Sequence, residues 1–102
     1  MKELQLFDTR ITDAGLAHLV VLEHLQELYL WHTRITGAGL VHLAGLTDLK
    51  SLSLNGSPIT DAGLVHLKEL NHLVVLDLEE TQVTDLGVAQ LEKALPTCDI
   101  IR

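Results

Sequence analysis

Large aromatic side chains are almost missing from this 102-residue chain, which contains one Trp, one Tyr and one Phe. Its 47% apolar content is therefore made almost entirely of Leu, Val, Ile and Ala. Because protein interiors are packed as densely as organic crystals, such uniform aliphatic side chains favour a core of similar, repeated layers. The length limits the chain to one domain of modest stability.

Basic side chains are also scarce, since seven Lys and Arg stand against 14 Asp and Glu and give a net charge of −7. Affinity for nucleic acid comes mainly from Lys and Arg side chains that neutralise phosphates. The charge balance therefore argues against nucleic acid as a partner.

The residues that disulfides and membrane spans require are missing as well. Cys98 is the single cysteine and has no partner within the chain, whereas disulfide frameworks belong to oxidising compartments. No apolar run approaches the roughly 18 residues that a membrane span requires, and no apolar targeting segment follows Met1. We expect a cytoplasmic protein without a membrane partner.

Repetition is what the sequence has in abundance, with a period of 24 residues. The recurring positions are Ile11, Ile35, Ile59 and Val83; Thr12, Thr36, Thr60 and Thr84; Gly15, Gly39, Gly63 and Gly87; and Leu19, Leu43, Leu67 and Leu91. Self-similarity at a fixed period across the whole unit is the signature of a solenoid of stacked repeats.

Each unit has the spacing Leu-x-x-Leu-x-Leu-x-x-Thr-x-Ile, as in Leu25, Leu28, Leu30, Thr33 and Ile35. This pattern resembles the leucine-rich-repeat family, and the T-x-I-T-D-x-G-L segment looks like the subclass related to the cysteine-containing repeats. The resemblance implies a strand at L-x-L, a turn at the ninth position, and a concave sheet that recognises other proteins.

The ninth position departs from the family, which usually has Asn or Cys there. Hydroxyl side chains take this place at Thr9, Thr33, Ser57 and Thr81. A stacked row of hydroxyls can satisfy backbone groups between neighbouring repeats. We therefore interpret these residues as structural.

The second half of each unit predicts a short helix. Thr12 and its equivalents are candidate N-caps, and Asp13, Asp61 and Asp85 place negative charge in the first turn. Leucines at three-residue intervals, such as those between Leu16 and Leu22, form the stripe that packs on the sheet. The recurrent glycine represented by Gly15 indicates close backbone approach between neighbours.

Together these signals predict an α/β leucine-rich-repeat solenoid with a parallel concave sheet and short convex helices. The predicted domain spans residues 1–102. It divides into a partial first repeat at 1–11, full repeats at about 12–35, 36–59 and 60–83, and a C-terminal unit at 84–102.

The two ends of the solenoid differ. No capping sequence precedes Leu4 and Leu6, whose strand forms an exposed sheet edge and offers a surface for self-association. The C-terminal unit has one extra residue and a proline before its final apolar pair, so it reads as a natural finish. Cys98 falls at the buried position of Leu49, which predicts a packed, unreactive thiol.

Histidine is the residue type that could suggest a metal, because His18, His42 and His66 recur on the predicted helices. Metal ligands lie about 2 Å from the ion, whereas equivalent positions on neighbouring helices lie about 8–10 Å apart. We expect half-buried structural imidazoles and no bound metal. No nucleophile elbow, phosphate loop, H-E-x-x-H or cysteine-pair motif occurs, so we predict neither an enzyme nor a cofactor.

The concave face carries the functional prediction, because strand alternation sends the residues between the leucines to the open side. All three aromatics, Phe7, Tyr29 and Trp31, fall in this set, although large apolar residues normally go inside. The plain alternative is a solvated sheet whose positions vary freely and whose aromatics pack on each other. The predicted partner-binding residues are Phe7, Tyr29, Trp31, His32, Asn55, Asp77, Glu79 and Glu80.

The sequence thus predicts a non-catalytic module that binds a partner protein or peptide, with Asp77, Glu79 and Glu80 facing a basic segment. A second hypothesis is a structural unit that forms a homo-oligomer through its uncapped N-terminal end. A metal site on the histidine row ranks a distant third.

Overall fold

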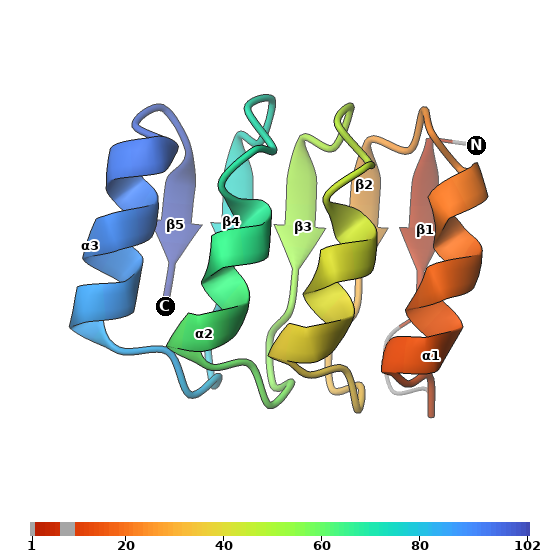
Figure 1. Ribbon diagram of the computed structural model, residues 1–102, viewed down its shortest axis with the longest axis horizontal. Coiled ribbons are helices and arrows are strands. Elements are labelled where there is room, and N and C mark those ends of the chain that lie inside the picture. The colour runs from red at the N-terminus through yellow and green to blue at the C-terminus, as the bar shows by residue number, and fades with distance from the viewer. Residues whose placement is uncertain (1, 7–9) are drawn as a thin grey trace.

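Five parallel strands lie side by side in chain order and form a single sheet (Figure 1). The computed structural model describes residues 2–6 and 10–102. Its strands are β1 (Glu3–Gln5), β2 (Glu27–Tyr29), β3 (Ser51–Ser53), β4 (Val75–Asp77) and β5 (Asp99–Ile101). Every residue of β1 to β4 pairs with the residue 24 positions further on, as in Leu4↔Leu28 and Leu28↔Leu52. The sequence period is therefore the register of the sheet.

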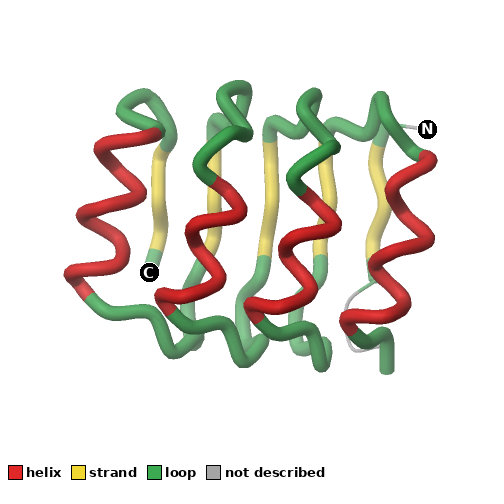
Figure 2. Tube along the Cα trace, in the orientation of Figure 1, coloured by secondary structure: helices red, strands yellow, loops and turns green. Residues whose placement is uncertain are grey.

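Helices cover one face of this sheet and leave the other face open (Figure 2). They are α1 (Asp13–Leu16) with the following 3₁₀ helix η1 (Ala17–Val21), the 3₁₀ helix η2 (Gly37–Leu43), α2 (Asp61–Leu64) with the following 3₁₀ helix η3 (Val65–Leu67), and α3 (Asp85–Ala94). The predicted α/β solenoid with a parallel sheet and short helices is confirmed.

The 3₁₀ geometry explains why the leucine stripe has a spacing of three. A 3₁₀ helix has three residues per turn, so residues i and i+3 lie one above the other. Leu40, Leu43 and Leu46 follow this spacing through and beyond η2, and all three are fully buried. Gly39 lies within the same segment, and glycine weakens an α-helix by roughly 0.5–1 kcal/mol relative to alanine.

The core is a stack of leucine layers between the sheet and the helices. The central strand residues Leu28, Leu52 and Leu76 are at most 2% exposed. Burying one such side chain contributes about 1.5–3 kcal/mol. Leu4 and Leu19 of the first unit are only half-buried, because a described repeat packs against them on one side alone.

The predicted hydroxyl row is confirmed where the chain is described. The Oγ1 of Thr33 donates to the carbonyl of Leu30 at 3.1 Å and lies 3.0 Å from the Oγ of Ser57. Ser57 Oγ in turn donates to the same Leu30 carbonyl at 3.0 Å, and Thr81 Oγ1 donates to the carbonyl of Leu78 at 2.6 Å. These hydroxyls therefore satisfy buried backbone carbonyls within and between repeats. Thr9 lies outside the described residues.

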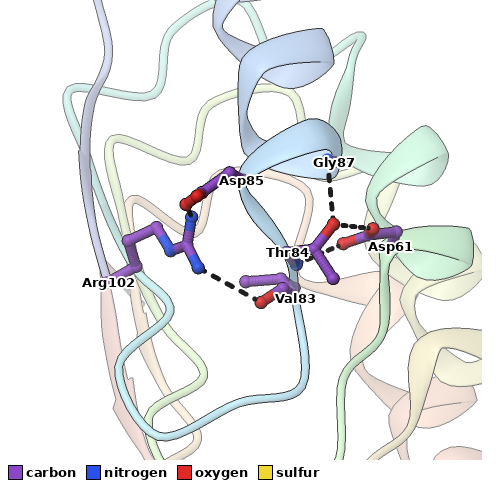
Figure 3. A network of polar contacts seen from close by, with 6 residues as sticks. All are labelled: Asp61, Val83, Thr84, Asp85, Gly87 and Arg102. Atoms are coloured by element: carbon purple, nitrogen blue, oxygen red, sulfur yellow. Dashed lines mark hydrogen bonds and ion pairs between the residues drawn. The ribbon is translucent and has the colours of Figure 1, made fainter.

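The recurrent aspartates do more than the helix-start role predicted for them. Asp13 and Asp61 lie in the first helical turn, but each carboxylate reaches the threonine at the start of the next unit's helix. The backbone N–H of Thr36 donates to Asp13 Oδ1 at 2.7 Å, and its hydroxyl donates to Oδ2 at 2.5 Å. Thr84 makes the same two contacts with Asp61 (Figure 3). We call this two-bond contact the Asp–Thr clasp.

The prediction that the recurrent threonines are helix N-caps is correct only in part. Thr36 and Thr84 accept hydrogen bonds from the backbone N–H groups of Ala38 and Gly87. Thr12 and Thr60 lie at helix starts as predicted but make no side-chain cap hydrogen bond.

The predicted close approach at the recurrent glycine is confirmed and has a specific cause. A Cβ at Gly39 would lie 2.2 Å from Asp13 Oδ1, and one at Gly87 would lie 2.1 Å from Asp61 Oδ1. Gly37 stands at the position that the clasp aspartates Asp13 and Asp61 occupy in the units before and after it, and there a Cβ at Gly63 would lie 2.4 Å from the Gly37 Cα. The glycine thus leaves room for either the carboxylate or the neighbouring backbone.

The extra residue of the C-terminal unit is absorbed before β5. Cys98 N–H donates to the carbonyl of Leu95 at 3.1 Å, as the equivalent Leu73 N–H does to Leu70 at 3.1 Å. Strand β5 nevertheless keeps the register Val75↔Asp99. The final apolar pair is thus part of a fifth strand.

The predicted buried position of Cys98 needs correction, because the residue packs against the core but is only half-buried. Burial, with a smaller contribution from Asp99, raises the pKa of its thiol. A raised pKa keeps the thiol protonated and hence poorly nucleophilic. At the other end of β5, Arg102 donates to Asp85 and to the carbonyl of Val83 (Figure 3).

The Asp–Thr clasp makes the stability of the fold sensitive to acid. The two hydrogen bonds from Thr84, its hydroxyl first, lower the pKa of Asp61 below its ordinary 3.8. A lowered folded pKa stabilises the chain above the unfolded pKa, and this contribution is lost as the pH falls through the folded value. We expect Asp61→Asn to lower the melting temperature at pH 7, with the difference from the parent chain shrinking below about pH 4.

Melting curves followed by circular dichroism across this pH range provide the measurement. Glu92→Gln serves as control, because Glu92 is exposed on α3. A difference between Asp61→Asn and the parent that stays constant down to low pH would contradict the clasp.

Candidate functional site

The open face of the sheet is the face turned away from the helices, and it corresponds to the concave face expected from the sequence. One row of residues crosses it in register, because Gln5 pairs with Tyr29, Tyr29 with Ser53, Ser53 with Asp77, and Asp77 with Ile101. Side chains alternate between the two faces of a strand, and the intervening leucines are buried. An aromatic ring, a hydroxyl, a carboxylate and an aliphatic side chain therefore stand next to one another.

A hollow of about 200 Å3 lies on this face. Its lining residues are Tyr29, Trp31, Ser51, Leu52, Ser53, Val75, Asp77 and Ile101. The hollow exists because β3 contributes short serine side chains between larger side chains of β2 and β4. We call it the serine hollow.

Tyr29 and Trp31 form the wall of the serine hollow on the side of β2. Their ring centroids are 6.0 Å apart with an interplanar angle of 72°, an edge-to-face arrangement that aromatic pairs prefer. Trp31 is 39% exposed, so a large apolar ring is open to solvent at the rim. The pair is thus both packed internally and available to a partner.

Glu27 fixes the position of the Tyr29 ring. The phenol donates to Glu27 Oε1 at 2.6 Å. This hydrogen bond, followed by burial and by the charges of Glu27 and Glu3, raises the pKa of Tyr29 to about 12. The phenol stays neutral at physiological pH and is held as a rigid wall.

Carboxylates surround the hollow. Asp77 lines it, and its Oδ1 accepts from the backbone N–H of Glu79 at 3.0 Å. Glu79 and Glu80 are exposed at the following turn, and Glu3 and Asp99 are exposed on the outer strands. None of the residues lining the serine hollow is Lys or Arg. The site therefore attracts positive charge.

Two buried polar atoms on or next to β3 have no hydrogen-bond partner. They are Ser53 Oγ and Asn55 Oδ1, and Ser53 itself is only 5% exposed. An unpartnered buried polar group costs about 1–3 kcal/mol. Because Ser53 also lines the hollow, an occupant with hydrogen-bond donors would remove this cost.

The structure brings together only some of the residues that the sequence singled out. Tyr29, Trp31 and Asp77 line one hollow, whereas Glu79 and Glu80 lie beside it at the turn after β4. Asn55 is half-buried at the turn after β3. Phe7 lies outside the described residues.

His32 has a local role in the turn after β2. Its backbone has a φ of 52°, a left-handed conformation that few non-glycine residues adopt. A Cβ at Gly56 would lie 2.4 Å from its ring Nδ1, so the imidazole rests on the glycine of the next unit. It is not among the residues that line the serine hollow.

The predicted set omitted five of the lining residues, namely Ser51, Leu52, Ser53, Val75 and Ile101. Ser53 falls on the open face by alternation, but nothing in the sequence marks its hydroxyl as unpartnered. Ile101 could have been found from the register, because it stands 24 residues after Asp77.

The recurrent histidines do not assemble a metal site. His18 is exposed, and His42 and His66 are half-buried. Within residues 2–6 and 10–102, no three His, Cys, Asp or Glu side chains are grouped so that they could hold a metal ion.

A larger depression of about 390 Å3 lies on the helical side, between η2 and α2. Gly37, Gly63 and His66 are among its lining residues, so it opens where Gly37 replaces the clasp aspartate. Neither of the two buried unpartnered side-chain atoms lines it. The serine hollow is the better-equipped site.

Two profiles of the leucine-rich-repeat family match the sequence. One, which describes two copies of the repeat, matches residues 23–66, and a single-repeat profile matches residues 1–20 and 69–91. The chain belongs to the leucine-rich-repeat family. Domains of this family generally mediate protein–protein interactions and are typically not enzymes. The assignment agrees with the parallel sheet and the buried leucine layers.

Solved leucine-rich-repeat structures have the same fold. A leucine-rich-repeat protein of Leptospira interrogans superimposes with a TM-score of 0.65 at 22% identity over 95% of this chain and 30% of its own. An internalin from Listeria monocytogenes gives 0.61 at 22% identity over 99% of this chain and 34% of its own. This leucine-rich-repeat chain thus spans about a third of the structures it matches. No curated protein matches the sequence.

No helix in the described part of this leucine-rich-repeat chain has the length and apolar character that crossing a membrane requires.

The contact between Tyr29 and Glu27 can be tested by alkaline titration. Tyr29 is the single Tyr of the chain, so its absorbance change reports this residue alone. Because the folded pKa is raised, the neutral phenol adds stability below pH 10 that is lost as the pH rises toward about 12. We expect a midpoint well above 10, and Glu27→Ala should move it back toward 10.

Glu92→Ala provides the control on the helical side, with circular dichroism showing that the chain is still folded over the titrated range. A midpoint near 10 in the folded parent chain would show that the phenol is not held by Glu27.

Proposed function

We propose that this leucine-rich-repeat chain binds an extended basic segment of a partner protein on the open face of its sheet. The observation that supports this most directly is the serine hollow, which joins the half-buried ring of Tyr29 and the exposed ring of Trp31 to a carboxylate and an unpartnered hydroxyl. The proposal includes no catalytic step.

The aromatic pair supplies the anchor in this proposal. Tyr and Trp are enriched among the residues that dominate the energy of protein interfaces, typically near the centre of the patch. Trp31 offers ring surface at the rim, and Tyr29 is already held by Glu27. A held side chain loses little conformational freedom when a partner binds, which favours this pair as the contact point.

The negative charge of the chain determines which sign of charge a partner needs. The chain carries a net charge of −7, and the side chains of Glu27, Asp77 and Asp99 stand on the open face. Complementary potentials accelerate encounter and exclude partners of the same sign. A segment with several Lys or Arg is therefore the partner that this face fits.

Within the family, we assign the chain to the T-x-I-T-D-x-G-L subclass. The Asp–Thr clasp supports this assignment, because the Thr, Asp and Gly of the motif all take part in it: the threonine donates to the aspartate, and the glycine leaves room for the carboxylate. The predicted cytoplasmic setting stays a prediction.

Self-association is the second candidate function. The outer edge of β1 has no strand against it among the described residues, and Leu4, Leu19 and Leu22 beside it are half-buried. An unpaired edge next to apolar side chains is a template for another chain. A second copy would then bury this end, with no need for the serine hollow.

A peptide of twelve residues with alternating Ser and Arg tests the proposal by calorimetry. We expect it to bind, and its affinity should fall as salt is added, because exposed charges are screened. Trp31→Ala and Tyr29→Ala should each weaken binding by about tenfold or more, as a lost interface anchor does.

Leu86→Ala is the matched control, because Leu86 is an exposed apolar residue on α3, 69% accessible. A Ser–Glu peptide of equal length controls for the sign of the charge. Equal affinity in the parent, Trp31→Ala and Tyr29→Ala would refute the proposal. Sedimentation of the chain alone should give a monomer, and a dimer that Trp31→Ala leaves unchanged would favour self-association through β1.

A further inference from the structure

We propose that the serine hollow is a socket for a single arginine side chain of the partner segment. This inference rests on the proposed function and adds a chemical specificity to it. It predicts that the site distinguishes arginine from lysine, although both carry one positive charge.

The size of the hollow points to one side chain. Pockets for small-molecule ligands typically measure about 300–1,000 Å3, whereas the serine hollow measures about 200 Å3. It is also lined by residues of four neighbouring strands, β2 to β5, so the side chain entering it would stand on β3, where the lining side chains are shortest. A partner strand or loop lying across the sheet could extend one long residue into it.

The aromatic wall favours a planar cation. A guanidinium group stacks on aromatic rings and is more weakly hydrated than the ammonium group of lysine. Tyr29 and Trp31 offer two ring surfaces in an edge-to-face arrangement at the hollow. An arginine can thus place its planar head against a ring and keep its edge free for hydrogen bonds.

Two hydrogen-bond acceptors across the hollow from the aromatic wall suit the free edge of the guanidinium group. Ser53 pairs with Asp77 in the sheet register, so a hydroxyl and a carboxylate stand next to each other on β3 and β4. Ser53 Oγ has no partner, and Asp77 uses Oδ1 for Glu79 while no described residue donates to its Oδ2.

Two neighbouring acceptors suit a donor group with a fixed fork. Arginine presents five N–H donors in one plane, whereas lysine presents three from a single point. One guanidinium can therefore reach the hydroxyl and the carboxylate together while it remains against the ring. An ammonium group has no planar face to stack on the ring, and its three donors, which spread from one atom, match two acceptors that stand side by side less well.

The test compares three peptides of twelve residues that alternate Ser with Arg, Lys or citrulline. Citrulline has the shape of arginine without its charge. We expect the Ser–Arg peptide to bind about tenfold more tightly than Ser–Lys, and the citrulline peptide to bind more weakly than either.

Ser53→Ala is the decisive variant, because it removes a hydroxyl that makes no hydrogen bond within the chain and should leave the fold intact. We expect it to reduce the ratio of Arg to Lys affinity to near unity. Thr97→Ala makes a comparable change, since it removes the hydroxyl of an exposed residue that does not line the hollow, and it should preserve the ratio. The melting temperature of each variant shows that it is folded.

The outcomes separate the two proposals. If the Ser–Arg and Ser–Lys peptides bind the parent chain equally and both lose affinity in Trp31→Ala, the arginine socket is overturned and the proposed function stands. If Arg is preferred and Ser53→Ala keeps the preference, the socket is likewise overturned. If neither basic peptide binds better than Ser–Glu, the proposed function falls together with the socket.

Discussion

The alignment of buried leucines from one repeat to the next is the constraint on which the whole structure depends. Leu28, Leu52 and Leu76 occupy equivalent, paired positions in neighbouring strands and are almost completely buried. Since no repeat can bury its apolar face alone, each layer is stable only when its neighbour is in register. A slip by one residue would turn every leucine to the open face.

Polar contacts between repeats make this register unique. The hydroxyl row joins Thr33 and Ser57 inside the turn, and the Asp–Thr clasp joins Asp61 to Thr84 on the helical side. Both kinds of contact link residues one repeat apart, so neither forms if the layers slip. The recurrent glycine makes the Asp–Thr clasp possible, because a Cβ at Gly87 would displace the carboxylate of Asp61. Where Gly37 interrupts the clasp, the backbones themselves approach closely.

The fold was largely predictable because it depends on periodicity, and the site was less so because it depends on single side chains. The 24-residue step gives the strands, the parallel register and the hydroxyl row from sequence alone. The reach of Asp13 across to Thr36 could not be read from the sequence, since an aspartate in the first helical turn already has a sufficient local explanation. The extra residue before Cys98 obscures strand β5 in the sequence, although Ile101 keeps the 24-residue step from Asp77.

The serine hollow shows a further limit of sequence reasoning. Alternation places Tyr29, Ser53 and Asp77 on the open face, but only the packing shows that short side chains on β3 leave a hollow between them. The unpartnered state of Ser53 is likewise a property of the assembled sheet. The binding surface forms where the repeat pattern permits variation: the leucines must stay, whereas the residues between them can be an aromatic, a serine or an acid.

The most direct test of the central claim is a map of amide and indole chemical shifts in the chain as the Ser–Arg peptide is added. We expect the largest changes at the Trp31 indole and at the amides of Tyr29, Ser53 and Asp77. Val41, Val65 and Leu86, which are exposed on the helical side, should be unaffected. Largest changes on those helices, or along the outer edge of β1, would contradict recognition by the open face of the sheet.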